Sequence, residues 1–267
     1  MLFENKIVWV TGGGSGIGEA MATEFAKQGA KVVVSGRRKE RLDAVVAKLG
    51  EERSLALPLD VTDEEAVHAA AQAIKSHFGG LDVTVANAGF GVAGRIEKLS
   101  AEDWRRQFDV NVVGLTTTVR ASLPLLRERS GRIALLGSVM SQLTVPGSGA
   151  YAASKYAVRA IGQTLSMELA GSGVSCTTIH PGFVESEIGQ VDNGGVYDEG
   201  RKDPRPQRFM WTSARAAKVC VRAIASRKRE FVFTGHGRVA AFLGRHFPGL
   251  NHLVGARSGG SKQLPKG

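Results

Sequence analysis

Three polar side chains near the middle of the sequence could act together on one substrate oxygen. Tyr151 and Lys155 are four residues apart, which places them on one face of a helix. A free phenol has a pKa near ~10, too high for proton transfer at neutral pH, but a nearby cation favours the phenolate and lowers that pKa. Ser138, which follows an apolar run, could hydrogen-bond the same oxygen. The pattern predicts acid/base chemistry on a carbonyl or alcohol, although an exposed Tyr–Lys pair also arises by chance.

A glycine-rich stretch near the N-terminus could hold a phosphate. The segment from Thr11 to Gly18 follows an apolar run and leads into an amphipathic one. Gly12, Gly16 and Gly18 permit a tight turn and close approach of the backbone to an anion, and the start of a helix offers free N–H groups. Glycine strings also occur in ordinary turns, so the inference depends on the position between a strand and a helix.

The elements that must position these residues alternate along the chain. Short β-branched runs are separated by longer amphipathic runs, a pattern typical of a parallel sheet covered by helices on both faces. No internal repeat or linker divides them, so we expect one domain over residues 1–257. We expect strands at residues 6–11, 31–35, 54–59, 82–86, 131–137, 174–180 and 230–234, and helices at residues 18–28, 39–49, 64–78, 101–128, 151–170 and 213–226.

The composition is that of an ordinary globular protein enriched in glycine, with 34 Gly among 267 residues. No apolar run is long enough to cross a membrane, and the N-terminus lacks the features of a signal peptide, so we expect a cytoplasmic protein. Cys176 and Cys220 have no ligand spacing. We expect both to be buried free thiols, and we predict no metal site.

The formal charge of +10 is concentrated toward the C-terminus. Residues 201–267 contain 15 Lys and Arg against two acidic residues, whereas the first 200 residues contain 20 basic and 23 acidic ones. A solvated basic surface is one interpretation; an anionic substrate, an anionic membrane surface or nucleic acid are the others. The chain has no nucleic-acid-binding motif, so we expect no nucleic-acid partner.

Several motifs, in chain order, resemble those of the short-chain dehydrogenase/reductase family over about residues 5–235. Three residues separate Gly12 from Gly16, which is the spacing of that family rather than of the commoner dinucleotide fingerprint. The resemblance implies an α/β fold, a single doubly wound Rossmann-fold domain with a seven-stranded parallel sheet of order 3-2-1-4-5-6-7. It also implies a homodimer or homotetramer formed through the helices at 101–128 and 151–170. The other motifs are Asp60-Val61, Asn87-Ala88-Gly89, Asn111, Ser138, Tyr151 with Lys155, and Pro181-Gly182.

Two arginines follow the second predicted strand, where an acidic residue of this fold would bind the ribose 2′-OH of NAD. Gly36 stands in place of that acid, and Arg37 and Arg38 come next. Without a carboxylate to repel it, a 2′-phosphate could bind these guanidinium groups. We therefore predict NADP(H) rather than NAD(H), with Arg37 as the main phosphate ligand and Arg38 stacking on the adenine. Alternatively, the two arginines only begin a helix.

The resemblance implies roles for further residues. Asn111 would hold a water that links Lys155 to solvent, or would cap or kink the long helix at 101–128. Lys155 would also bind the nicotinamide ribose, and Asp60 would bind the adenine amino group. Several of the implied cofactor contacts lie in turns that any protein could form. Those contacts are Gly12, Gly14, Ser15, Gly16, Ile17, Gly18, Arg37, Arg38, Asp60, Val61, Asn87, Ala88, Gly89, Tyr151, Lys155, Pro181, Gly182, Val184 and Ser186.

The implied reaction is hydride transfer between C4 of the nicotinamide and a carbonyl or secondary alcohol carbon. Tyr151 would act as the acid and base, Ser138 would hold the oxygen, and Lys155 would lower the pKa of Tyr151. Two other functions remain open. One is a binding protein that senses NADP without turnover, and the other is an enzyme that uses bound nicotinamide internally for epimerisation or dehydration.

Two segments of the chain could contact the substrate or lie near it. Residues 183–212 stand where relatives place a substrate lid, and its residues 209–211 (Phe, Met, Trp) could line an apolar pocket or belong to the core. Residues 236–257 resemble the C-terminal extension of relatives that act on hydrophobic carbonyl compounds. This extension could lie on a membrane surface, but we favour packing on its own domain or on a dimer partner. We expect residues 258–267 to be a disordered tail.

Overall fold

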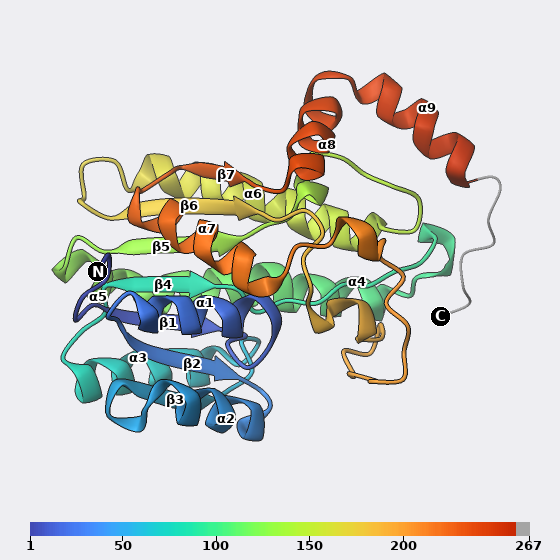
Figure 1. The fold of residues 1–267 in the computed structure, drawn as a ribbon. Coiled ribbons are helices and arrows are strands. Elements are labelled where there is room, and N and C mark those ends of the chain that lie inside the picture. The colour runs from blue at the N-terminus through green and yellow to red at the C-terminus, as the bar shows by residue number, and fades with distance from the viewer. Residues whose placement is uncertain (260–267) are drawn as a thin grey trace.

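The computed structural model describes residues 1–259, and in them a parallel sheet carries helices on both faces (Figure 1). The strand order β3-β2-β1-β4-β5-β6-β7 confirms the predicted doubly wound Rossmann fold. Because both faces are buried, the strands are near-continuous apolar runs rather than alternating ones. The strands are β1 (Ile7–Thr11), β2 (Lys31–Gly36), β3 (Ser54–Pro58), β4 (Val83–Ala86), β5 (Arg132–Leu136), β6 (Ser175–His180) and β7 (Glu230–Val232).

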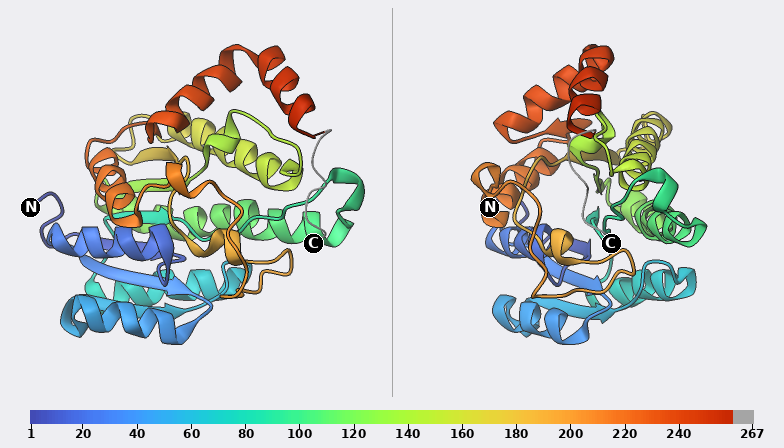
Figure 2. Two further views of the ribbon diagram at one scale, coloured as in Figure 1. Left: turned by 45° about the vertical axis from the view of Figure 1, so that its right-hand side comes forward. Right: turned by 90° about the vertical axis from the view of Figure 1, so that its right-hand side faces the viewer.

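The helices form a layer on each face of the sheet (Figure 2). Side chains of β1 alternate between the two layers: Val8 and Val10 join one apolar cluster, and Ile7 and Trp9 join the other. The first layer contains α1 (Gly16–Lys27), α2 (Lys39–Leu49) and α7 (Ser213–Ala225). The second contains α3 (Glu64–Phe78), α5 (Leu115–Glu128) and α6 (Gly149–Glu168).

The ends of the predicted elements agree with the observed ends to within two residues, with one exception. Local signals explain this agreement. At the start of α3 the Asp63 side chain accepts a hydrogen bond from the Ala66 N–H, and Gly79 ends the helix with a φ of 81°. The exception is internal: the helix predicted at 101–128 is helical throughout and has the predicted ends, but its middle is π-helical. A π-helical segment, η3 (Asp109–Gly114), separates α4 (Ala101–Phe108) from α5.

Two helices at the C-terminal end lie outside both layers. They are α8 (Gly235–His246) and α9 (Pro248–Gly259), and they project beyond the β7 edge of the sheet (Figures 1 and 2). The predicted disordered tail began at residue 258, but α9 continues to Gly259, so that boundary is wrong by two residues. The remaining predicted tail, 260–267, lies outside the described residues.

Both cysteines are buried free thiols, as predicted from their spacing. Cys176 lies in β6 and Cys220 lies in α7. Burial raises the pKa of both thiols, for Cys176 to about 12. They therefore stay neutral and pack as small apolar side chains.

Candidate active site

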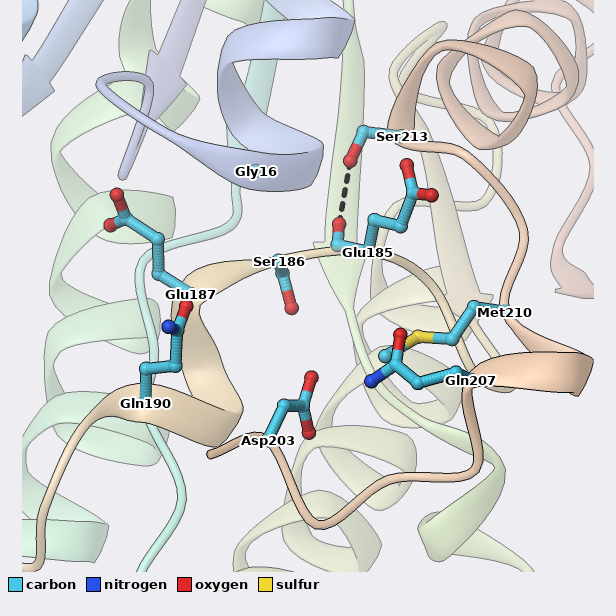
Figure 3. A pocket seen from close by; sticks show the side chains of 9 residues that line it. All are labelled: Gly16, Glu185, Ser186, Glu187, Gln190, Asp203, Gln207, Met210 and Ser213. Carbon is cyan, nitrogen blue, oxygen red and sulfur yellow. Dashed lines mark hydrogen bonds between the residues drawn. The ribbon is translucent and has the colours of Figure 1, made fainter. Parts of the chain in front are cut away.

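A cleft of about 560 Å³ lies along the carboxyl ends of strands β1 to β6. It brings together every residue predicted to contact a cofactor, along with Ser138. A second cavity of about 380 Å³ lies between the start of α1 and residues 185–213 (Figure 3). Its lining includes neither Tyr151 nor Lys155, so the larger cleft is the candidate active site.

The turn after β1 has the shape that an anion site requires. Gly12 and Gly16 have φ values of 64° and 54°, in the left-handed region. A Cβ atom on Gly18 would lie 2.1 Å from the Gly12 carbonyl oxygen, so only glycine lets α1 pack this closely on the turn. Ser15, at the N-cap of α1, makes no side-chain capping hydrogen bond. The first N–H groups of α1 therefore have no side-chain cap and suit a phosphate.

The predicted acid/base residues meet where α6 passes the end of β5. Tyr151 and Lys155 lie one turn apart in α6, and Lys155 Nζ is 5.8 Å from the centre of the Tyr151 ring. Ser138, which follows β5, is 8% exposed and lies close enough to Tyr151 to oppose the rise in the pKa of that phenol. Two hydroxyls and an ammonium group thus line the same part of the cleft.

Burial has the largest influence on the pKa of Tyr151 in this structure, and lowering of that pKa by Lys155 stays a prediction. Burial raises the pKa of the phenol above its ordinary 10.0, and the opposing influences are the Ser138 hydrogen bond and the Arg205 charge. Lys155 donates from Nζ to the Leu136 carbonyl at 2.8 Å. Burial also lowers the pKa of Lys155, from 10.5 to about 8. Tyr151 therefore holds its proton at neutral pH.

Asn111 lies behind the cleft rather than in its lining. It is fully buried in η3, where its Oδ1 accepts from the Phe90 N–H at 3.1 Å and its Nδ2 donates to the Phe90 carbonyl at 3.0 Å and to Ser154 Oγ at 3.1 Å. A Cβ atom on Gly89 would lie 3.0 Å from Asn111 Oδ1 and 3.7 Å from Lys155 Nζ. The bonds to Phe90 and the π-helical geometry fit the interpretation in which this residue kinks the helix. Its role in holding a water stays a prediction.

Asp60 and Asn87 shape turns at the other end of the cleft. Oδ1 of Asp60 accepts hydrogen bonds from the Thr62 N–H at 3.0 Å and from the Thr62 hydroxyl at 2.8 Å. Nδ2 of Asn87 donates to the carbonyls of Thr11 at 2.9 Å and Gly12 at 3.2 Å. Both residues therefore have the turn-forming role that was the alternative to cofactor binding, and both also line the cleft.

The two arginines predicted to bind a 2′-phosphate contact the lid. Arg37 is exposed and donates from Nη2 to the Gly195 carbonyl at 3.0 Å. Arg38 forms an ion pair with Glu187, and its guanidinium carbon is 5.5 Å from the centre of the Tyr197 ring. Sequence reasoning missed Glu187, which stands 149 positions from its partner. A carboxylate therefore does lie near this subsite, although it comes from the lid and not from the end of β2.

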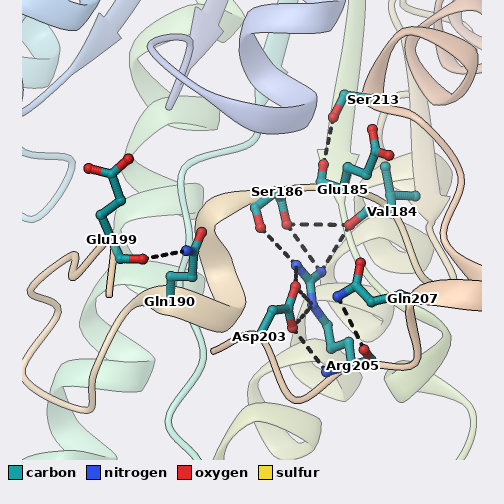
Figure 4. A network of polar contacts seen from close by, with 9 residues as sticks. All are labelled: Val184, Glu185, Ser186, Gln190, Glu199, Asp203, Arg205, Gln207 and Ser213. Carbon is teal, nitrogen blue, oxygen red and sulfur yellow. Dashed lines mark hydrogen bonds and ion pairs between the residues drawn. The ribbon is translucent and has the colours of Figure 1, made fainter. Parts of the chain in front are cut away.

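Arg205, also missed, organises the segment that follows β6 (Figure 4). Its guanidinium donates to the carbonyls of Val184 at 2.9 Å and Ser186 at 2.7 Å, and to Ser186 Oγ at 3.2 Å. Asp203 accepts from the same guanidinium at 2.7 Å. Although burial raises the pKa of Asp203, hydrogen bonds from Arg205 hold it below its ordinary 3.8. In the sequence, the Asp-Pro-Arg-Pro run signals only a turn.

Phe209, Met210 and Trp211 of the lid do not line the main cleft. Phe209 packs at 5.7 Å from the His236 ring, and Trp211 packs at 5.8 Å from the Phe233 ring. Met210 lines the smaller cavity (Figure 3). Of the two interpretations given for these residues, Trp211 fits the core, against which it packs, and Met210 lines a cavity other than the main cleft.

A buried polar chain lies directly behind Ser138, and sequence reasoning missed it. Nδ1 of the fully buried His180 is 2.8 Å from Ser141 Oγ, and Ser141 donates to the Ser138 carbonyl at 2.6 Å. On its other side, His180 Nε2 is 3.2 Å from Glu230 Oε1, although the angle is poor for a hydrogen bond. Ser138 and Ser141 follow β5, His180 ends β6, and Glu230 begins β7. Because these residues are far apart in the sequence, no spacing pattern reveals their contacts.

The chain is similar in sequence and in fold to several known proteins. A family model described as short chain dehydrogenase matches residues 6–194. An uncharacterised oxidoreductase of Staphylococcus aureus is 39% identical over 202 residues, which cover 75% of this chain and 87% of the relative. A short-chain dehydrogenase/reductase of Burkholderia phymatum in complex with NAD has a TM-score of 0.82 at 27% identity over 100% of both chains. A short-chain dehydrogenase of Burkholderia cenocepacia in complex with NADP has a TM-score of 0.78 at 28% identity, covering 89% of this chain and 100% of that one.

Proposed function

Because the chain belongs to the short-chain dehydrogenase/reductase family, we propose that it is an NADP(H)-dependent oxidoreductase, a carbonyl reductase that acts reversibly between a carbonyl and a secondary alcohol. One observation carries the proposal. Ser138, Tyr151 and Lys155 gather beyond β5 in the same cleft that holds Arg37 and Arg38 beyond β2. The cleft therefore offers acid/base groups and phosphate-binding groups in one continuous space.

The residues of the cleft fit a dinucleotide in several ways. The glycine turn and the uncapped start of α1 suit the pyrophosphate, and Asp60 suits the adenine amino group. Lys155 would hold the nicotinamide ribose, and the segment from Pro181 to Ser186 would contact the nicotinamide. When bound, the cofactor would supply or accept the hydride.

Tyr151 would supply the proton in the reductive direction. As the carbonyl carbon gains a hydride, its oxygen gains negative charge and needs a donor within hydrogen-bonding reach. The phenol of Tyr151 is protonated at neutral pH, and a cation beside it would offset the rise in pKa that burial causes and ease loss of that proton to the oxygen. Ser138 would hold the oxygen in place. With a pKa of about 8, Lys155 is cationic at neutral pH and would stabilise the phenolate left after transfer.

The preference for NADP(H) is supported by charge at the end of β2. Gly36 provides no carboxylate there, and three arginines, Arg37, Arg38 and Arg41, line the adjoining wall of the cleft. Glu187 pairs with Arg38 and lies 3.9 Å from Arg41. A 2′-phosphate would compete with this carboxylate for the same guanidinium groups. One of the two structural relatives was solved with NAD and the other with NADP, so they do not favour either cofactor. The proposed preference for NADP(H) therefore rests on the arginines.

We also retain the proposals of a cytoplasmic enzyme, a hydrophobic substrate, a mobile substrate lid and a homodimer or homotetramer. Support for the oligomer comes from apolar side chains exposed on η3 and α6, namely Val113 at 51%, Tyr156 at 40% and Met167 at 69%. Exposed apolar patches of this kind often mark subunit contacts.

A cofactor-oxidation assay tests the proposed function. The purified protein would be incubated with NADPH or NADH and a panel of aldehydes, ketones and quinones, and loss of the reduced cofactor would be compared with product formed. One cofactor oxidised per product, with NADPH preferred, is the expected result. Product without net oxidation would indicate internal redox chemistry instead. Tight NADPH binding without turnover of any compound would favour a sensor.

A further inference from the structure

The C-terminal arm, defined as α8 and α9 (residues 235–259), touches the domain through a narrow inner face. A Cβ atom on Gly244 would lie 2.3 Å from the Gln142 carbonyl oxygen, so α8 sits directly against that backbone. In α9, Nδ2 of Asn251 donates to the Thr144 carbonyl at 3.2 Å. Small residues and a few polar bonds thus hold the arm on the segment between β5 and α6.

The exposed side of the arm carries large apolar residues on both of its helices. Residues three and four apart on a helix share one face, and the large apolar residues of α8 and of α9 follow this spacing. Seven of them are between 37% and 61% exposed. Soluble monomers rarely leave an apolar strip of this length uncovered. The seven are Val239, Phe242, Leu243, Phe247, Leu250, Leu253 and Val254.

The arm is also positively charged. Residues 235–259 contain three arginines and three histidines and no Asp or Glu. Arg245 pairs with Glu230 at 3.3 Å, whereas Arg238 and Arg257 are exposed beside the apolar strip. A surface that covers the strip must therefore accommodate apolar side chains at its centre and positive charge at its margin. Negatively charged lipid headgroups above acyl chains have this combination.

We propose that the arm is a peripheral membrane anchor that lays its apolar outer face into the interface of an anionic lipid bilayer. Helices with aromatic and aliphatic residues on one face and arginines beside them bind with their axes in the plane of the surface. Figures 1 and 2 show the arm projecting from the edge of the sheet, where a flat surface can reach it. None of the helices within residues 1–259 is long and apolar enough to cross a bilayer.

A second copy of the chain complements the same face less well. If two arms packed against each other, Arg238 and Arg257 of both copies would come together around the apolar contact. Like charges at a shared contact disfavour association, whereas anionic headgroups neutralise them. The charge of the arm therefore favours lipid over self-association.

Vesicle flotation with the full-length protein tests the proposal. Vesicles of phosphatidylcholine mixed with phosphatidylglycerol should carry the protein upward in a density gradient. Vesicles of phosphatidylcholine alone should bind it about fivefold more weakly for each arginine that contacts the surface. Binding to the anionic vesicles should also fall as the salt concentration rises.

Single substitutions separate the apolar and the charged contributions. Phe242→Ser and Leu253→Ser should each weaken vesicle binding about tenfold, and Arg257→Gln should weaken it about fivefold. Matched controls come from exposed residues outside the arm and outside the proposed subunit contact: Ile96→Ser, 69% exposed, between β4 and α4, and Arg222→Gln on α7. Both controls should bind as the wild type does. All five positions are exposed, so circular dichroism should show an unchanged fold.

Several results would overturn the proposal. These are failure of the wild type to float with anionic vesicles, binding that ignores lipid charge, or equal binding by arm and control variants. Light scattering adds another: arm variants that turn an oligomer into monomers, without vesicle binding by the wild type, would assign the strip to a subunit interface. Flotation needs neither cofactor nor substrate, so its outcome is independent of the proposed oxidoreductase activity.

Discussion

Replacing Glu230 by glutamine removes the negative charge that His180, Arg159 and Arg245 share at the edge of the sheet. Its Oε1 lies 2.6 Å from Arg159 Nε and 3.2 Å from His180 Nε2, and its Oε2 lies 3.3 Å from Arg245 Nη2. Glutamine has nearly the same size, so the change removes charge and leaves packing in place. The three partners then lose the negative charge, and one of the two accepting oxygens becomes an NH2 donor.

The size of the effect follows from the pKa of this carboxyl. Contact with His180, helped by Arg159 and opposed by burial, lowers the pKa of Glu230 from 4.5 to about 2. A lowering of that extent corresponds to at most ~3 kcal/mol of folding stability at neutral pH. The side chain is 28% exposed and the angle to His180 is poor, so solvent screening reduces the expected loss to ~1–2 kcal/mol. In a domain of this size, Tm should fall by roughly 2–6 °C.

The loss should depend on pH in one direction. A carboxyl whose pKa is lowered by folding stabilises the folded protein above its ordinary pKa of 4.5, and that stabilisation disappears as the pH falls towards about 2. Glutamine does not titrate. The advantage of the wild type over Glu230→Gln should therefore be complete at neutral pH and shrink below pH 4.5.

Urea unfolding at neutral and acidic pH, followed by tryptophan fluorescence, measures this difference. Glu128→Gln is the matched control, because Glu128 pairs with Lys75 at 2.8 Å but its side chain is 51% exposed. Its loss should stay below ~0.5 kcal/mol. Equal losses in the two variants, or a wild-type advantage that persists undiminished in acid, would refute the reasoning.

Three further changes test the candidate site. Tyr151→Phe should leave NADPH binding nearly intact and lower kcat by ~10²–10⁴-fold, because the phenol is the proposed proton donor; a binding titration and a steady-state assay measure the two effects. Arg37→Asp should lower the ratio of kcat/KM for NADPH to that for NADH by ~tenfold or more, because a carboxylate there repels the 2′-phosphate. Glu187→Gln should tighten NADP⁺ binding roughly three- to tenfold, with little change for NAD⁺, because Arg38 loses its competing carboxylate; calorimetry measures both affinities.

Each of these three predictions has a result that would contradict it. Unchanged turnover in Tyr151→Phe would remove the phenol from the mechanism. A retained preference for NADPH in Arg37→Asp would argue against a 2′-phosphate site at this position. Arg127→Gln, an exposed control, should retain the preference in either case. Equal gains for NADP⁺ and NAD⁺ in Glu187→Gln would mean that the lid as a whole, and not the charge opposite Arg38, limits binding.

Local patterns in the sequence predict the sheet and most of the cleft. The ends of α3 are marked by Asp63 and Gly79, whose capping roles need only their immediate neighbours. The carboxyl ends of parallel strands meet at one edge of the sheet, so motifs that follow different strands must lie near each other. The resemblance to the family assigned Gly12, Asp60 and Asn87 to one site, and the shared edge of the sheet explains why they meet there.

Contacts between distant segments could not be predicted in this way. The pairing of Arg38 with Glu187 depends on how the lid folds back over the end of β2. The π-helical segment within the helix predicted at 101–128 contains Asn111, whose bonds to Phe90 the sequence does not reveal. The raised pKa of Tyr151 depends on burial, which the spacing of residues does not reveal.

Arg245 belongs to the arm, yet it donates to Gln142 at 3.2 Å as well as pairing with Glu230. The two C-terminal helices are therefore not a detachable module. A shortened protein that stops after residue 234 would lose Arg245, one of the cations that hold Glu230 against His180. His180 contacts Ser141, and Ser141 in turn donates to the backbone carbonyl of Ser138. Loss of turnover after such trimming would report a loosened serine, and could be mistaken for proof that the removed helices themselves bind substrate.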